Sequence, residues 1–225
     1  MKKILSLVLI LLCNLMIAQN EVYQFKKASP ESKGFSSDKL QILAEHLESS
    51  GSSSMMLLKD GEVFFEWGDT NKKHLIHSMR KALLNSLYGI AIAQGKIDTS
   101  ATLRELKITD IGGLSETELS ARVADVLKSR SGIYHNAAAV NNAMLRGRPK
   151  RNTHEPGTYY YYNNWDFNVA GAILEQQTGE SIYEQFHKYI AQPLGMQHYQ
   201  GKVVTLNIET DDDFDLDTDG IYQFE

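Results

Sequence analysis

The chain has 225 residues, of which 42% are hydrophobic and 23% are charged, and these fractions are typical of a soluble globular protein. Its formal net charge of −5 at pH 7 excludes the strongly basic surface that binds nucleic acids or anionic membranes. We therefore expect no nucleic-acid partner.

The first 18 residues have the pattern of a secretory signal peptide. Met1-Lys2-Lys3 is a short basic start, residues 4–18 are almost wholly apolar, and polar sequence follows Ala18. The apolar run is too short and wrongly flanked for a membrane span. We predict cleavage after Ala18, no stable membrane span once the signal is removed, and a secreted or periplasmic protein. Residues 19–225 are then expected to form one domain.

The single cysteine, Cys13, lies inside the predicted signal peptide. The mature protein is therefore expected to contain no disulfide bond. A lipoprotein anchor at Cys13 is disfavoured because Leu12 stands where a small residue is expected and apolar sequence continues beyond it. A chain of roughly 205 residues can be stable on its hydrophobic core alone.

The first predicted elements are a helix and a hairpin. Ser36 or Ser37 caps a helix whose apolar face includes Leu40 and Leu47. Residues 55–67 then read as two strands joined by a tight turn at Lys59-Asp60-Gly61, where Asp-Gly is a strong hairpin signal.

Helices dominate the sequence that follows the hairpin. Residues 78–93 predict a long, weakly charged helix that is buried on most sides. Ser115 and Glu118 form a capping box ahead of a helix that contains Leu119 to Leu127. Residues 135–155 are polar and predict a loop-rich excursion.

A tyrosine-rich segment leads into the last predicted helices. It runs into a helix from about Phe167 to Gln177, which Gly179 stops, and a capping box at Ser181 and Glu184 begins another helix. Trp165 and Phe167 are expected in the core. A hairpin followed mostly by helices predicts the α+β class and does not show the alternation of a doubly wound sheet.

Ser78 and Lys81 are the first candidates for chemistry. Residues three apart share a helix face, with Cβ atoms about 5–6 Å apart, and a helix N-terminus favours negative charge. A lysine removes a serine proton only if it is neutral near pH 7, which needs its pKa to fall by roughly 3 units from about 10.4. Burial against the apolar residues after Lys81 can supply that shift.

The same Ser-x-x-Lys pattern also occurs at residues 36–39. There Ser36 is needed as a helix cap, and Lys39 falls on the polar side of an amphipathic helix. We therefore assign no chemistry to this second match.

Several further features follow the Ser78 helix in order. They are Ser131-Gly132-Ile133 at a helix end, Pro156-Gly157-Thr158 ahead of Tyr162-Asn163-Asn164, an apolar helix, and Gln192-Pro193-Leu194-Gly195-Met196. Together with Ser78 and Lys81, over roughly residues 30–200, they resemble the serine beta-lactamase-related family of class C beta-lactamases, D-alanyl-D-alanine carboxypeptidases and esterases. The resemblance implies a beta-lactamase/transpeptidase-like fold with an antiparallel sheet and a mostly helical subdomain.

The resemblance also implies roles for individual residues. Ser78 would be the acylated nucleophile and Lys81 its general base. Tyr162 would share the proton transfer and protonate the leaving group. Asn164 would hold the substrate's carbonyl through its side-chain amide, and the backbone N–H of Ser78 would form half of an oxyanion hole.

The register of the Tyr-x-Asn motif has alternatives, because Tyr161-Tyr162-Asn163 and Tyr134-His135-Asn136 also fit it. Counting from Pro156-Gly157-Thr158, as the family does, selects Tyr162 and Asn164. His77 and His135 could line a cleft near Ser78, yet a lone histidine is usually structural, and we leave both out of the catalytic set.

One departure from the family is serious. Its third motif, Lys or His followed by any residue and Gly, has no credible match after Asn164, since Gln177-Thr178-Gly179 fits a helix end better. The last strands of the family's sheet are also expected to be missing. We interpret the chain as a C-terminally incomplete fragment. The competing hypothesis is a truncated, inactive relative that binds a peptide or cell-wall fragment.

No cofactor is expected, because the implied mechanism needs none. The expected partner is a small-molecule or peptide substrate: an ester, a beta-lactam or a D-amino-acid-containing cell-wall peptide. No His, Glu or Asp pattern has zinc-site spacing. Residues 215–220 imitate the start of a calcium loop but lack its later glutamate and a preceding helix, so we expect a solvated acidic loop and no metal site.

Overall fold

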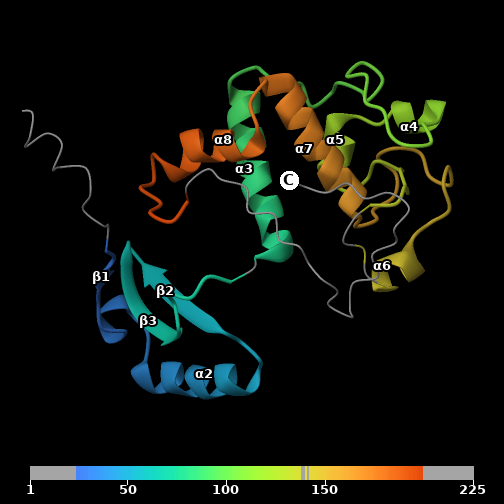
Figure 1. The fold of residues 1–225 in the computed structure, drawn as a ribbon. Coiled ribbons are helices and arrows are strands. Elements are labelled where there is room, and N and C mark those ends of the chain that lie inside the picture. Colours follow the sequence, from blue (N-terminus) through green and yellow to red (C-terminus); the bar gives the residue numbers. More distant parts are fainter. Residues whose placement is uncertain (1–23, 75, 138–139, 141, 200–225) are drawn as a thin grey trace, which may run out of the picture. The chain divides into compact units, whose positions relative to one another are not determined.

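The computed structural model describes residues 24–74, 76–137, 140 and 142–199 (Figure 1). The chain divides into two compact units between Leu75 and Ile76, and each is described by itself. The predicted signal peptide and the acidic segment 215–220 lie outside the described residues.

The first unit contains the predicted antiparallel hairpin. Strand β2 (Ser54–Lys59) pairs with β3 (Glu62–Gly68), and the pairing is antiparallel. Asp60 and Gly61 both have positive φ, 54° and 74°, which is the conformation that favours Asp-Gly in a two-residue hairpin turn. The predicted hairpin is therefore confirmed. A two-residue strand that the sequence did not predict, β1 (Lys26–Lys27), pairs parallel to β3 on its other side.

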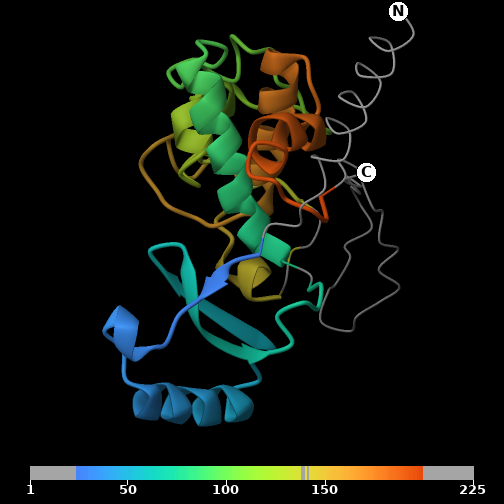
Figure 2. The ribbon, with the colours of Figure 1, turned by 90° about the vertical axis from the view of Figure 1, so that its left-hand side faces the viewer.

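Helix α2 (Ser37–Ser49) follows a short 3-10 turn, η1 (Glu31–Lys33), and runs beside the sheet (Figures 1 and 2). The side chain of Ser36 accepts a hydrogen bond from a backbone N–H of the first turn at 3.4 Å, so it is the predicted cap. Leu40 and Leu47, which are two helical turns apart, are its buried residues.

The second unit is helical. Its elements are η2 (His77–Met79), α3 (Arg80–Ala93), α4 (Glu116–Leu119), α5 (Val123–Val126), α6 (Asn142–Gly147), α7 (Asn164–Thr178), α8 (Ile182–Phe186) and η3 (His187–Ala191). α3 packs against α7 and α8, and α5 packs against α7. Their facing residues form one hydrophobic core. Within it the hydroxyl of Tyr88 donates to the backbone carbonyl of Ala170 at 2.7 Å and so joins α3 to α7.

α3 is less buried than its composition predicted. Leu87, Tyr88 and Ala91 are its buried residues, whereas Met79 just ahead of it is 73% exposed and Leu83 is also exposed. The prediction that this helix is buried on most sides was wrong, because α7 and α8 pack against one face. Among the described residues, no helix has the length and hydropathy that a bilayer span requires.

The helix predicted over residues 119–127 is two short helices, α4 and α5. The helix is interrupted between them because Arg122 forms an isolated antiparallel bridge with Thr102. The backbone N–H of Leu103 also donates to the carbonyl of Ala121 at 2.8 Å. Hydrogen bonds to a distant segment therefore replace helical ones. The capping boxes predicted ahead of α4 and α8 are both present.

α7 begins earlier than predicted, at Asn164 and not near Phe167. The side chain of Asn163 accepts a hydrogen bond from the backbone N–H of Asp166 at 2.7 Å, which makes Asn163 the N-cap. Gly179 ends the helix with a φ of 72°, so its prediction as the stop is confirmed.

Candidate active site

Ser78 lies in the 3-10 turn η2 that leads directly into α3. His77 before it has a φ of 40°, in the left-handed region that costs a non-glycine residue conformational energy. Lys81 follows in the first turn of α3, and its Nζ donates to Ser78 Oγ at 2.9 Å. In the second Ser-x-x-Lys match, by contrast, Ser36 caps α2 and Lys39 is exposed.

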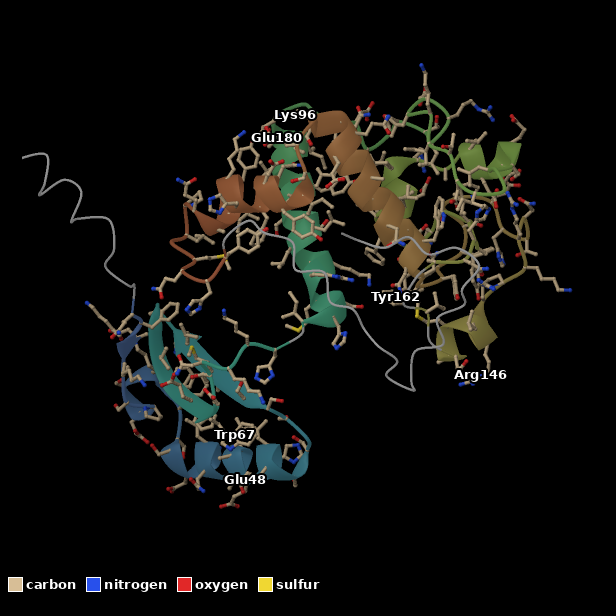
Figure 3. All side chains as sticks on the ribbon, in the orientation of Figure 1. Glu48, Trp67, Lys96, Arg146, Tyr162 and Glu180 are labelled. Atoms are coloured by element: carbon tan, nitrogen blue, oxygen red, sulfur yellow. The ribbon has the colours of Figure 1, made fainter. Side chains whose placement is uncertain are left out.

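Tyr162 and Asn164 reach the same place from a segment more than 80 residues away. The hydroxyl of Tyr162 donates to Ser78 Oγ at 2.9 Å, and Lys81 Nζ donates to Asn164 Oδ1 at 3.1 Å. Figure 3 shows Tyr162 beside the first turns of α3 and α7. The structure thus brings together all four residues singled out in the sequence. We call Ser78, Lys81, Tyr162 and Asn164 the Ser78 cluster.

Residues of the other two Tyr-x-Asn registers have different partners. The hydroxyl of Tyr161 donates to the backbone carbonyl of Met144 at 2.7 Å, and Asn163 caps α7. In the third register, the hydroxyl of Tyr134 lies 2.9 Å from Nδ1 of His154. These contacts place the other registers outside the Ser78 cluster.

The environment of Tyr162 makes its phenol more acidic. Burial alone would raise the pKa of Tyr162, but its hydrogen bonding with Lys81 and Ser78 and the positive charge of Lys81 together lower that pKa below its ordinary value. A phenol of this kind gives up its proton more readily than a free tyrosine does.

Phe167 is a neighbour of the Ser78 cluster that sequence reasoning missed. Its ring centroid lies 4.8 Å from Lys81 Nζ, and its ring meets that of Tyr162 at a centroid distance of 5.7 Å. Phe167 is only half-buried, so its prediction as a core residue was wrong, whereas Trp165 is buried in the core as expected. The available signal was helical spacing, since Phe167 lies three residues after Asn164 on one face of α7.

A second polar cluster surrounds His135. Its Nδ1 lies 2.8 Å from Asp110 Oδ2, which also accepts a hydrogen bond from Trp165 Nε1 at 2.7 Å. Its Nε2 lies 3.6 Å from Glu118, whose two carboxylate oxygens accept hydrogen bonds from Arg151 at 2.8 and 2.7 Å. We call these five residues the His135 network. No sequence pattern connects them, because each comes from a different segment of the chain.

The third residue of α7, Asp166, is fully buried. Burial raises the pKa of Asp166 to about 8, although Ser131 and Asn163 beside it offset part of this effect. Neither carboxylate oxygen meets a hydrogen-bond donor at good distance and angle among the described residues. The described residues also contain no group of three or more His, Cys, Asp or Glu side chains arranged to hold a metal ion.

Two known proteins are similar to this chain in sequence. A predicted D-alanyl-D-alanine carboxypeptidase of Escherichia coli (strain K12) is 22% identical over 213 residues, covering 76% of this chain and 49% of that protein. The D-aminopeptidase of Brucella anthropi is 24% identical over 179 residues, covering 70% of this chain and 34% of that protein. The chain therefore spans about half the length of the first relative and about a third of the second.

Solved structures show the same fold at low sequence identity. A predicted beta-lactamase from Bacteroides dorei DSM 17855 superposes with a TM-score of 0.55 at 19% identity, over 70% of this chain and 51% of that one. FmtA from Staphylococcus aureus gives 0.54 at 19% identity, over 82% of this chain and 56% of that one. These likenesses confirm the α+β, beta-lactamase/transpeptidase-like fold.

The profile of the family described as Beta-lactamase matches residues 41–212, which is more than half of the chain. This match confirms the family resemblance inferred from the sequence. The chain belongs to the Beta-lactamase family.

Proposed function

We propose that the protein is an exported serine hydrolase that acts through an acyl-enzyme on an ester, a beta-lactam or a D-amino-acid-containing peptide. The observation that carries the proposal is the convergence of two proton-transferring groups on one hydroxyl. Lys81 Nζ and the Tyr162 hydroxyl each lie 2.9 Å from Ser78 Oγ, within the distance that proton transfer requires. The predicted signal peptide over residues 1–18 supports export.

In the proposed acylation step, the proton of Ser78 Oγ moves to the neutral amine of Lys81 while Oγ bonds to the substrate's carbonyl carbon. The electron pair of the carbonyl goes to its oxygen. The backbone N–H of Ser78, at the start of a helix, would donate to that oxyanion. The side-chain amide of Asn164, whose oxygen accepts a hydrogen bond from Lys81, would hold the substrate's own carbonyl.

The acyl-enzyme forms when the bond to the leaving group breaks. Tyr162 would donate its proton to the departing nitrogen or oxygen, which its lowered pKa favours, and the phenolate would then recover a proton from the Lys81 ammonium. Water then attacks the ester on Ser78, with the same groups moving the proton in reverse, and the free hydroxyl is restored.

The substrate class rests on the relatives. They are named for D-alanyl-D-alanine carboxypeptidase and D-aminopeptidase activities. We therefore favour a peptide that contains a D-amino acid, with esters and beta-lactams as the alternative acyl donors.

The test is covalent labelling of the purified full-length protein with a fluorescent penicillin or a phosphonate. We expect one label per molecule on the peptide that contains Ser78, and no label in Ser78→Ala. Ser86→Ala is the matched control, because Ser86 lies on the same helix and bonds to the backbone carbonyl of Ala82. Label that persists in Ser78→Ala would contradict the proposal.

The alternative is a non-catalytic function. A protein of this kind would bind a peptide or cell-wall fragment without turning it over. Saturable binding of a D-amino-acid peptide by calorimetry, with no label on Ser78 from either probe, would favour this second function.

A further inference from the structure

We propose that Phe167 is a positioning residue whose ring face stabilises the positive charge that Lys81 acquires during acylation. The inference rests on the proposed function, because it concerns the step in which Lys81 takes the proton of Ser78. It adds an aromatic group to a site otherwise described by its hydrogen bonds.

The geometry places Lys81 Nζ at a corner formed by two rings. Nζ lies 4.8 Å from the ring centroid of Phe167 and 5.2 Å from that of Tyr162, both within the roughly 6 Å range of cation–π attraction. The two rings meet at 51° with their centroids 5.7 Å apart, so they form adjoining walls. The Ser78 and Asn164 oxygens accept hydrogen bonds from the same nitrogen.

One turn of α7 supplies two of these groups. Asn164 and Phe167 lie three residues apart, so their side chains share a helix face. The amide oxygen of Asn164 and the ring face of Phe167 both present negative potential to the amine. α7 therefore contacts Lys81 through two side chains: Asn164 accepts a hydrogen bond from the amine, and Phe167 presents its ring face to it.

A ring face suits this position for a chemical reason. The amine must be neutral to accept the proton of Ser78 and becomes an ammonium when it has done so. A carboxylate at this distance would hold a proton on Lys81 beforehand by forming an ion pair. The weaker quadrupole of a half-buried ring favours the developing charge, and the ring itself is not a base that could take a proton from the amine.

The experiment replaces Phe167 with phenylalanine analogues that carry one, two or three ring fluorines. Fluorination withdraws electron density from the ring face and changes the size of the ring little. We expect the rate constant for labelling Ser78 with fluorescent penicillin to fall with each added fluorine, by roughly 5- to 20-fold for the trifluorinated ring. Phe167→Tyr, which keeps a ring face, should label at close to the wild-type rate, and Phe167→Leu should label slowly.

The matched control is the same fluorinated series at Phe186. This residue is buried in α8 and packs against Tyr199 at a centroid distance of 4.8 Å. Fluorination there should leave the labelling rate unchanged. Thermal unfolding of every variant separates changes in folding from changes in rate.

The outcomes distinguish this inference from the proposed function. A wild-type protein that labels on Ser78 but shows a flat or rising rate across the fluorinated series would overturn the role of Phe167 alone. A wild-type protein that does not label on Ser78 would overturn the proposed function, and this inference with it.

Discussion

The first turn of α7 connects two polar clusters that contain similar groups in different surroundings. Asn164 contacts the Ser78 cluster, whereas Trp165, the next residue, contacts the His135 network. Successive helix positions point about 100° apart, so neighbours in sequence serve separate environments. Ser78 is exposed, while the side chain of Glu118 in the His135 network is 1% exposed.

The two clusters differ in how their acidic, basic and hydroxyl groups are surrounded. In the His135 network, buried carboxylates are matched to N–H donors, which is what burial of charge requires. In the Ser78 cluster, Lys81 Nζ and the Tyr162 hydroxyl both donate hydrogen bonds to the hydroxyl of an exposed serine. We therefore expect substitutions in the Ser78 cluster to change activity and substitutions in the His135 network to change stability.

The largest expected effect is that of Lys81→Met. Loss of the base should slow labelling of Ser78 by about 10³-fold, within the range for general acid–base catalysis. Stability should change little, because Lys81 is only partly buried. Lys96→Met, at the opposite end of α3 from Tyr162 (Figure 3), is the control and should label normally. Normal labelling of Lys81→Met would mean that the Ser78 cluster is structural, like the His135 network.

Glu118→Gln should have the largest effect on folding. It leaves Arg151 without its carboxylate partner and removes the negative charge that faces His135 Nε2, and because Glu118 is buried we expect the free energy of unfolding to fall by about 3 kcal/mol. Urea denaturation measures this change, and the labelling rate of the folded protein should be unaffected. Glu116→Gln is the matched control, because Glu116 pairs with Arg104 at the surface and its side chain is 85% exposed. Equal decreases in the free energy of unfolding of Glu118→Gln and Glu116→Gln would contradict the expected difference between a buried and an exposed carboxylate.

Asp166→Asn should flatten the dependence of stability on pH. The pKa of Asp166 is raised to about 8 in the folded protein, against about 3.9 for an unfolded aspartate. The folded state therefore binds more protons in this window. The stabilisation from that extra proton is full below pH 4 and is lost as pH rises through 8.

The measurement for Asp166 is urea denaturation at pH 5.5, 6.5 and 7.5. Wild-type stability should fall relative to Asp166→Asn by up to about 1.4 kcal/mol per pH unit. Taking the difference between the two proteins cancels the histidine titrations that they share. Parallel pH profiles would show that the carboxyl is charged in the folded protein.

Trp165→Phe should give the smallest effect. It removes the hydrogen bond to Asp110 and keeps most of the apolar ring, so we expect a loss of about 1 kcal/mol in unfolding free energy. Labelling of Ser78 should proceed at the wild-type rate. A tenfold slower rate would show that the two clusters are coupled through α7, and the contrast between them would then have to be abandoned.

Local signals predicted much of the fold. Ser36 and the two capping boxes marked helix starts, because their side chains bond to backbone N–H groups within a few residues. Asp60-Gly61 marked the hairpin turn and Gly179 marked a helix end, because these residues adopt positive φ readily. The break at Arg122 could not be predicted in this way. Its partner, Thr102, lies 20 residues earlier, and only folding brings the two together.

The same distinction applies to the candidate site. Helical spacing alone indicated that Ser78 and Lys81 are neighbours, whereas Tyr162 and Asn164 were predicted only through the family resemblance. The His135 network had neither kind of signal, because burial of charged residues depends on tertiary packing. Phe167 was misread for a related reason, since an apolar residue on a helix gives no indication that its ring faces an amine.

The bond between Tyr88 and Ala170 has a consequence for the alignment of the Ser78 cluster. α3 carries Lys81 and α7 carries Asn164, so the cluster forms only when these helices keep a fixed longitudinal offset. Sliding one helix by a single turn would shift it by about 5.4 Å, far more than a hydrogen bond tolerates. The Tyr88 hydroxyl, anchored on the opposite backbone at 2.7 Å, opposes such sliding from within the core. The spacing between the amine and the amide is thus held by a contact that no substrate reaches.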